Sequence, residues 1–157
     1  MEALFSTCLT FREALIKKVG NLDDDALDFI PEGFNNSIRW NLAHLVATPC
    51  LLTYRMTGQE PPLISGDFID SAKKGTNPND FSLIEDFGIK HLCELLIEVP
   101  KQIQRDYPDL KDLEFKPYET STGFMMKNID QAIAYSNIHD GIHFGTVSAI
   151  KTLFDQS

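Results

Sequence analysis

The chain has 157 residues, 43% of them hydrophobic, and a formal net charge of −9, which favours one globular domain, residues 1–157, around one core. Its 14 lysine and arginine residues are spread thinly, so the chain lacks the concentrated positive charge that a nucleic-acid partner requires. No apolar run approaches the ~20 residues of a membrane-spanning helix, so the sequence predicts no membrane partner either.

The first predicted helix ends at Gly20, a typical helix stop. Five apolar or small residues recur before it at spacings of three and four, which places them on one helical face: Leu4, Cys8, Phe11, Leu15 and Val19. Residues 21–36 are predicted to form a connection. Its acidic run, Asp23 to Asp25, is interpreted as a solvated loop or the start of a short helix.

A second helix is predicted from the N-capping residue Ser37 to about Thr57, with Gly58 after its end. Its inward-facing stripe comprises Trp40, His44, Ala47, Leu51 and Tyr54. Pro49 lacks the backbone N–H of a helical residue, so we expect a kink there. Residues 59–78 are rich in proline, glycine, serine and asparagine and are predicted to form a long surface connection.

Two further helices are predicted, over residues 82–105 and from the capping residue Asn128 to about Phe154. The stripe of the first comprises Phe81, Ile84, Gly88, Leu92, Leu95, Val99 and Ile103. The stripe of the second comprises Ile129, Ala132, Ser136, His139, His143, Thr146, Ile150 and Leu153. Residues 107–127 between them are irregular, with a short hairpin as one interpretation. Together, the four amphipathic segments predict an all-α four-helix bundle with long crossover connections.

Three histidines are predicted to face the interior of this bundle. His139 and His143 are four residues apart, which places both imidazoles on one helical face, and His44 lies on the stripe of the second helix. Neutral buried imidazoles need hydrogen-bond partners and charged ones repel each other, whereas a divalent ion would satisfy all three. The pattern alone leaves open whether these are metal ligands or hydrogen-bonded core residues. His91, beside Leu92, is interpreted as a boundary residue.

The segment from His139 to His143 also invites comparison with the HExxH motif of zinc proteases, with Asp140 in place of glutamate. Aspartate is one methylene shorter and would place a general base differently. No downstream histidine or glutamate has a metalloprotease spacing, so the sequence disfavours a protease.

Cysteine usage and the N-terminus both predict a cytoplasmic protein. Cys8, Cys50 and Cys93 are scattered without a CxxC pair, and we interpret them as buried thiols rather than a disulfide framework. The residues after Met1 lack a basic region and a cleavage site, so no signal peptide is predicted.

Two stretches of the chain resemble the DinB-like (DinB/YfiT) superfamily. Residues 37–45 resemble its t-i-x-W-x-l-x-H-l segment, and residues 139–146 resemble its H-E-x-x-H-x-G-Q segment. The resemblance implies a four-helix bundle, a divalent metal (zinc or nickel) bound by His44, His139 and His143, and a homodimer. The chain departs from the pattern at Asp140 and Thr146, where the family commonly has glutamate and glutamine.

The resemblance also implies an activity, since members of this family include metal-dependent S-transferases that use low-molecular-weight thiols such as bacillithiol or mycothiol. We therefore expect a thiol S-transferase acting on a small-molecule substrate. A metal-dependent hydrolase and a non-catalytic, stress-related dimeric metal-binding module remain alternatives. Arg39 and Arg55 are candidate contacts for a carboxylated thiol, and three tyrosines are candidate proton donors: Tyr54, Tyr118 and Tyr135.

Overall fold

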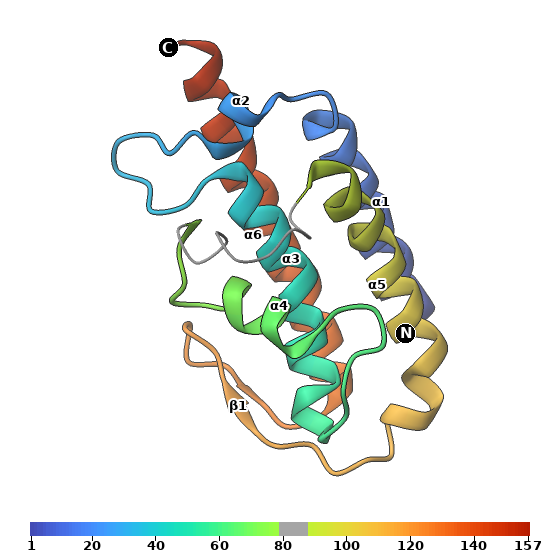
Figure 1. Cartoon of the computed structure of the whole chain (residues 1–157). Helices are drawn as coiled ribbons and strands as arrows, with labels where there is room; N and C mark the ends of the chain where they lie inside the picture. Colours follow the sequence, from blue (N-terminus) through green and yellow to red (C-terminus); the bar gives the residue numbers. More distant parts are fainter. Residues whose placement is uncertain (79–87) are drawn as a thin grey trace.

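A computed structural model of the chain describes residues 1–78 and 88–157. Four long helices lie side by side (Figure 1): α1 (Glu2–Val19), α3 (Ile38–Thr53), α5 (Ile89–Leu110) and α6 (Ile129–Asp155). Shorter elements connect them: α2 (Asp24–Asp28), the 3₁₀ turn η1 (Arg55–Thr57), α4 (Gly66–Ala72) and the antiparallel pair β1 (Tyr118–Glu119) and β2 (Met125–Met126). The predicted all-α bundle is confirmed.

Helix α3 lies in the centre of the bundle. All but two of its 16 residues are buried, and a helix that is buried nearly all round must be covered by other elements on every side. It packs against α5, α6 and α4, while α1 closes the bundle by packing against α5 and α6. His44, in the middle of α3, therefore lies inside the protein.

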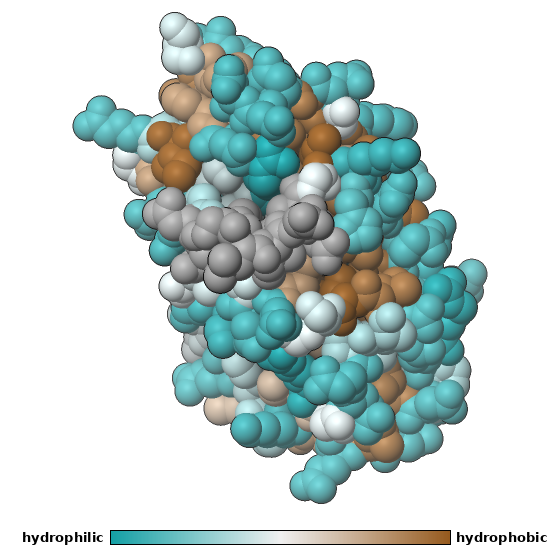
Figure 2. Space-filling model, viewed as in Figure 1, coloured by the Kyte–Doolittle hydropathy of each residue, from teal (hydrophilic) through white to brown (hydrophobic). Residues whose placement is uncertain are grey.

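The face of the bundle seen in Figure 2 is largely polar. Figure 2 shows a mostly hydrophilic face in which apolar areas are separated by polar side chains, as the net charge of −9 leads one to expect. In the described part of the chain, no helix combines the length and the apolar character needed to cross a membrane.

The predicted helix starts are confirmed by their caps. The Ser37 hydroxyl accepts a hydrogen bond from the Trp40 N–H at 3.2 Å, and the Asn128 side chain accepts one from the Gln131 N–H at 2.9 Å. The second predicted helix ends as an α-helix at Thr53 and continues as η1. Gly58 follows with φ 73°, a left-handed conformation that glycine adopts without strain.

The acidic run in residues 21–36 begins the short helix α2, capped by the Asp23 side chain, which confirms its interpretation as the start of a short helix. Two other predicted segments need correction. Residues 59–78 are not only a surface connection, because they contain α4, whose Phe68, Ile69 and Ala72 are buried. The third helix extends to Leu110 rather than Arg105, and the part predicted over residues 82–87 lies outside the described residues.

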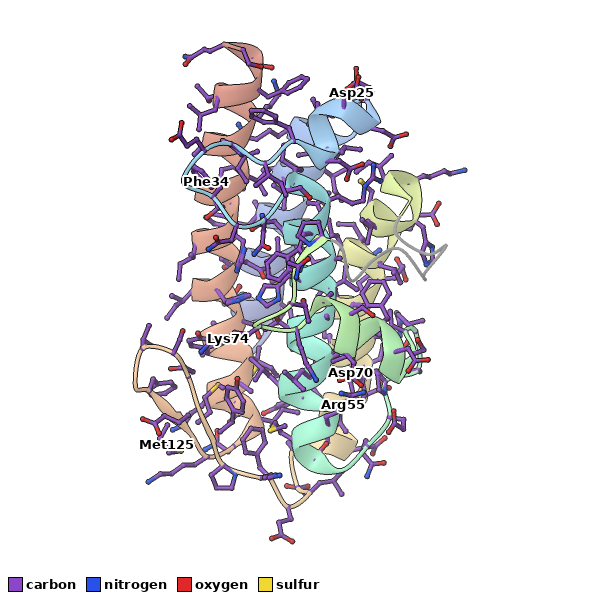
Figure 3. The ribbon with its side chains drawn as sticks, turned by 60° about the vertical axis from the view of Figure 1, so that its left-hand side comes forward. Asp25, Phe34, Arg55, Asp70, Lys74 and Met125 are labelled. Carbon is purple, nitrogen blue, oxygen red and sulfur yellow. The ribbon has the colours of Figure 1, made fainter. Side chains whose placement is uncertain are left out.

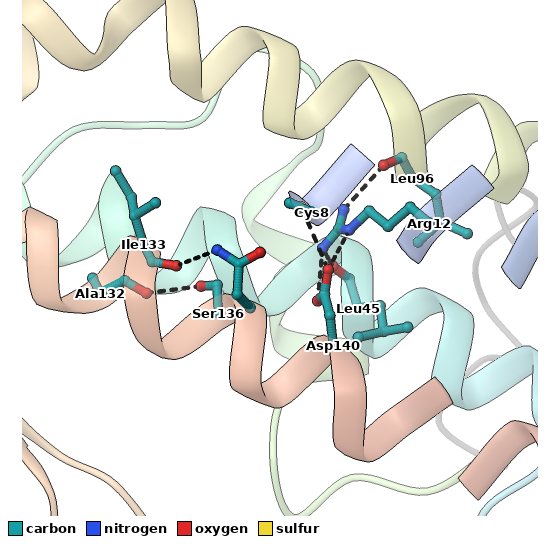
Figure 4. A network of polar contacts seen from close by, with 9 residues as sticks. Cys8, Arg12, Leu45, Leu96, Ala132, Ile133, Ser136 and Asp140 are labelled. Carbon is teal, nitrogen blue, oxygen red and sulfur yellow. Dashed lines mark hydrogen bonds and ion pairs between the residues drawn. The ribbon is translucent and has the colours of Figure 1, made fainter. Parts of the chain in front are cut away.

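A buried arginine links all four long helices (Figure 4). Pro49 in α3 and Pro100 in α5 have no N–H, so the carbonyls of Leu45 and Leu96, four residues earlier, have no helical donor. Arg12 of α1, only 1% exposed, donates to both of these oxygens, at 2.7 Å and 3.1 Å respectively. The same guanidinium forms an ion pair with a carboxylate on α6. Arg12 therefore supplies donors to both carbonyls that the prolines leave without a helical partner.

Candidate metal centre

Helices α3 and α6 bring His44, His139 and His143 together. One ring nitrogen from each lies within 4.8 Å of the other two, and the Nε2 atoms of His44 and His139 are 3.1 Å apart. Two nitrogens bound to one tetrahedral zinc ion are separated by about 3.3 Å, given a Zn–N distance of ~2.0–2.1 Å. The cluster therefore has the donor atoms and the spacing that a divalent ion requires.

Hydrogen bonds to the far ring nitrogens orient two of these imidazoles. The Nδ1 of His44 lies 2.6 Å from the Ala72 carbonyl oxygen, which can only accept, so Nδ1 carries the proton. The Nδ1 of His143 lies 2.7 Å from Oδ1 of Asn41, whose amide nitrogen donates to the Ser37 carbonyl at 2.7 Å. Both rings thus present an unprotonated Nε2 to the cluster, as metal-ligating histidines do.

Burial keeps the three imidazoles neutral. Burial is the largest cause of the lowered pKa of His44. Burial also lowers the pKa of His139 to about 2, with further contributions from His143 and His44. Burial and the neighbouring His44 lower the pKa of His143 to about 4. At neutral pH the nitrogen lone pairs are therefore free to bind a cation.

The same pKa values predict that the metal-free protein loses stability as the pH falls from about 6.5 towards 4. Histidines of the unfolded chain bind protons near pH 6.5, whereas folded His143 binds one only near pH 4, so acid favours the unfolded state in this window. Urea unfolding at pH 7.5, 6 and 5 measures this loss. His143→Gln should make the free energy of unfolding depend less on pH in this window, whereas His91→Gln should leave that pH dependence unchanged. Equal slopes for the two variants would contradict the assignment.

Trp40 and the end of α4 cover one side of the cluster. The Trp40 ring stacks on the His44 ring with centroids 4.6 Å apart, and its indole N–H donates to the Thr76 hydroxyl at 3.1 Å. Helix α4, which supplies the Ala72 carbonyl, is itself held by the ion pair between Arg55 and Asp70 (Figure 3). The segment predicted as a plain connection is therefore part of the site.

The cluster opens into a cavity of about 340 Å³. Its walls come from α3, α6, the segment after α4 and the turn between β1 and β2, and they include all three histidines. Leu51, Leu52 and Ile142 provide apolar surface, and Tyr118 and Tyr135 provide hydroxyl groups. A ligand in this cavity would therefore lie directly against the three imidazoles.

Asp140 does not face the cavity, so it cannot serve as the base of a protease-like motif. It is 4% exposed, and its two oxygens accept hydrogen bonds from Arg12 at 2.7 Å and 3.1 Å (Figure 4). Cys8 donates to the same carboxylate at 3.4 Å, and burial raises the pKa of this thiol to about 11. Asp140 therefore anchors α6 to α1.

The two arginines predicted as anion contacts form ion pairs with aspartates in the structure. Arg39 donates to Asp28 at 2.7 Å, and Arg55 donates to Asp70 at 3.0 Å, so both guanidinium groups are held by surface carboxylates. Neither of them lines the cavity. The described structure therefore gives no support to Arg39 and Arg55 as contacts for a carboxylated ligand.

Two of the three candidate tyrosines reach the cavity. The Tyr54 hydroxyl instead donates to Asp106 at 2.6 Å, whereas Tyr118 and Tyr135 line the cavity wall. His91 lies on α5 with a half-exposed side chain 3.9 Å from Glu94, which agrees with its interpretation as a boundary residue.

Asn41 was not singled out from the sequence, although it holds His143. We expect Asn41→Ala to weaken divalent-metal binding by about 10–100-fold, the usual cost of losing a hydrogen-bonded partner of a ligand. The chain has one tryptophan, which stacks on His44, so quenching of its fluorescence by Co²⁺ reports binding directly. Asn137→Ala is the matched control, because within the described residues that amide donates only to the Ile133 carbonyl. Equal affinities of the two variants would remove Asn41 from the site.

Comparison with protein families gives one match relevant to this site. The model described as the DinB superfamily matches residues 9–147, a range that contains the three histidines, Arg12 and Asp140. Comparison with curated proteins finds no match.

Proposed function

The chain belongs to the DinB superfamily, and we propose that it is a metal-dependent enzyme whose ion, zinc or nickel, is held by His44, His139 and His143. The observation that carries this proposal is the cavity of about 340 Å³ that opens on the cluster. Among the described residues, no fourth histidine, cysteine or carboxylate joins the three histidines. Three protein ligands beside an open position are typical of catalytic rather than structural zinc sites.

The reaction we propose is transfer of a low-molecular-weight thiol to a small electrophile. A bound divalent ion would lower the pKa of a coordinated thiol, so that a thiolate nucleophile is available at neutral pH. The chain supports this chemistry through its cavity walls, because Leu51, Leu52 and Ile142 line the reacting position with apolar surface.

Tyr118 and Tyr135 are the residues that we propose to orient the second substrate. In the described part of the chain neither hydroxyl has a hydrogen-bond partner, so both are free to donate to a ligand. Tyr135 lies one turn before His139 on α6, with ring centroids 6.0 Å apart. A donor at this position lies close to the metal-bound reactant.

Turnover with and without a chelator tests the proposed function. Protein purified without a histidine tag should conjugate a thiol such as cysteine with 1-chloro-2,4-dinitrobenzene, and dipicolinate should abolish the rate. His91→Ala should keep both activity and metal. Equal rates with and without chelator would exclude a metal-held thiolate. Chelator-sensitive hydrolysis of a p-nitrophenyl ester without thiol conjugation would instead identify a hydrolase.

The homodimer that the family resemblance implies is also part of the proposal. Helix α6 exposes Ile138 and Ile142, which are 65% and 56% accessible, so the chain has apolar surface that a second copy could cover. Light scattering on the purified protein measures the mass. A monomer at micromolar concentration would contradict the dimer without affecting the metal site.

A further inference from the structure

The cavity above the histidines differs in charge from the rest of the protein. The chain carries 23 acidic residues, yet none of the described ones lines this cavity. Asp140 follows His139 in the sequence, but both of its carboxylate oxygens accept hydrogen bonds from Arg12. A divalent ion on three neutral imidazoles would therefore keep its positive charge, because the described walls offer nothing to balance it.

One cation adds to this positive charge. Lys74, on the segment after α4, is the one lining residue among those described that carries a formal charge (Figure 3). Its neighbour Lys73 donates to Asp70 at 3.0 Å, whereas the Lys74 ammonium has no hydrogen-bond or ion-pair partner within the described chain. Lys74 is therefore available to a ligand and Lys73 is not.

Hydroxyl groups line the same cavity as Lys74. They come from the turn between β1 and β2, where Thr120, Ser121 and Thr122 contribute to the lining. The Thr120 side chain is fixed, because its oxygen accepts from the Phe124 N–H at 3.0 Å and lies 3.0 Å from the Thr122 hydroxyl. An ammonium group together with hydroxyls suits a carboxylate, whereas the apolar walls suit a short hydrocarbon body.

We propose that Lys74 selects small organic anions for this cavity: one end of the ligand meets the metal and a carboxylate at the other end binds the Lys74 ammonium. This inference rests on the proposed function, since it assumes an ion on the three histidines. The cavity, at about 340 Å³, is at the lower end of the ~300–1,000 Å³ found for small-molecule sites, which limits the ligand to a small molecule.

Two thiols with the same three-carbon chain, one ending in a carboxylate and the other in a neutral hydroxyl, test the proposal on the Co²⁺-loaded protein. The probes are 3-mercaptopropionate and 3-mercapto-1-propanol, and the change in Co²⁺ absorption on thiolate binding gives each dissociation constant. The wild type should prefer the carboxylate by about tenfold, the ratio that ~1.4 kcal/mol of ion pairing gives. Lys74→Ala should reduce this preference several-fold, to what the charge of the metal alone provides, and Lys74→Arg should keep it.

Lys73→Ala is the matched control, because it removes the same charge from the neighbouring position. It should leave the preference intact, since that ammonium is held by Asp70. An unchanged preference in Lys74→Ala, or an equal loss in both alanine variants, would overturn the inference.

Failure of the proposed thiol chemistry gives a different result. In that case neither thiol changes the Co²⁺ spectrum although the metal is bound. The anion site is then tested by calorimetry with glutarate, a dicarboxylate without a thiol. Glutarate that binds Lys74→Ala more weakly than it binds the wild type and Lys73→Ala would support the role of Lys74. No binding of glutarate to the wild type, or equal binding to all three proteins, would overturn the inference.

Discussion

Replacement of Arg12 by alanine is expected to lower the free energy of unfolding by about 3–5 kcal/mol, because it leaves a buried carboxylate without its counter-charge. Asp140 is 4% exposed and would lose both of its hydrogen bonds to the guanidinium. The carbonyls of Leu45 and Leu96 would also lose their donor, and each has no helical alternative because a proline follows four residues later.

Urea unfolding followed by circular dichroism measures this loss. Arg12→Lys should retain part of the stability, since one ammonium keeps the charge but cannot reach four acceptors on three helices. Lys151→Ala is the control on the same helix bundle: its ion pair with Asp155 is solvent-accessible and should contribute less than about 1 kcal/mol. If Arg12→Ala were no more destabilising than Lys151→Ala, the arginine would not be the central support of the bundle.

Replacement of His139 by alanine is expected to weaken divalent-metal binding by more than about 100-fold, since even partners of a ligand contribute ~10–100-fold. At pH 5 the metal-free variant should be no less stable than the metal-free wild type. The removed imidazole is partly buried beside His44 and His143, and burial lowers its pKa to about 2, so below about pH 6.5 the unfolded wild type binds a proton on this ring that the folded wild type does not bind.

Thermal unfolding with and without Zn²⁺ separates these two effects. The wild type should gain stability from bound metal according to its affinity, and His139→Ala should lose that gain. His91→Ala should respond to Zn²⁺ as the wild type does, because His91 lies on the surface of α5. A zinc-induced gain in His139→Ala equal to that of the wild type would show that the ion binds elsewhere.

The sequence predicts the ligand set because histidine placement follows from helical periodicity. His139 and His143 share a face by their spacing, and His44 lies on the stripe that begins at Trp40. The caps at Ser37 and Asn128 are equally local and were predicted at the correct residues. The approach of His44 to the two histidines of α6 depends on tertiary packing, and only the family resemblance predicted it.

Periodicity placed several exposed residues on buried faces, among them Leu153 and Phe11, and the misplacement of Phe11 has a clear physical reason. Periodicity assigned Phe11 to the buried face of α1, yet Phe11 is 45% exposed and Arg12 is 1% exposed. A buried arginine is costly unless it is fully paired, and its partner Asp140 lies 128 residues away. No local rule connects these two positions.

Helix α4 was missed because it is too short for periodicity to show. Its seven residues, Gly66–Ala72, lie in a segment rich in glycine and proline, and only the capping serine before them signals a helix. Its contribution to the site, the Ala72 carbonyl that orients His44, is a backbone group that no residue type encodes.

Anomalous diffraction from crystals of the metal-loaded protein tests the three-histidine site most directly. The account predicts one peak per chain, about 2.0–2.1 Å from Nε2 of each of His44, His139 and His143, with the remaining position occupied by solvent or thiol on the cavity side. A peak away from these nitrogens, or a fourth protein side chain on the ion, would contradict it.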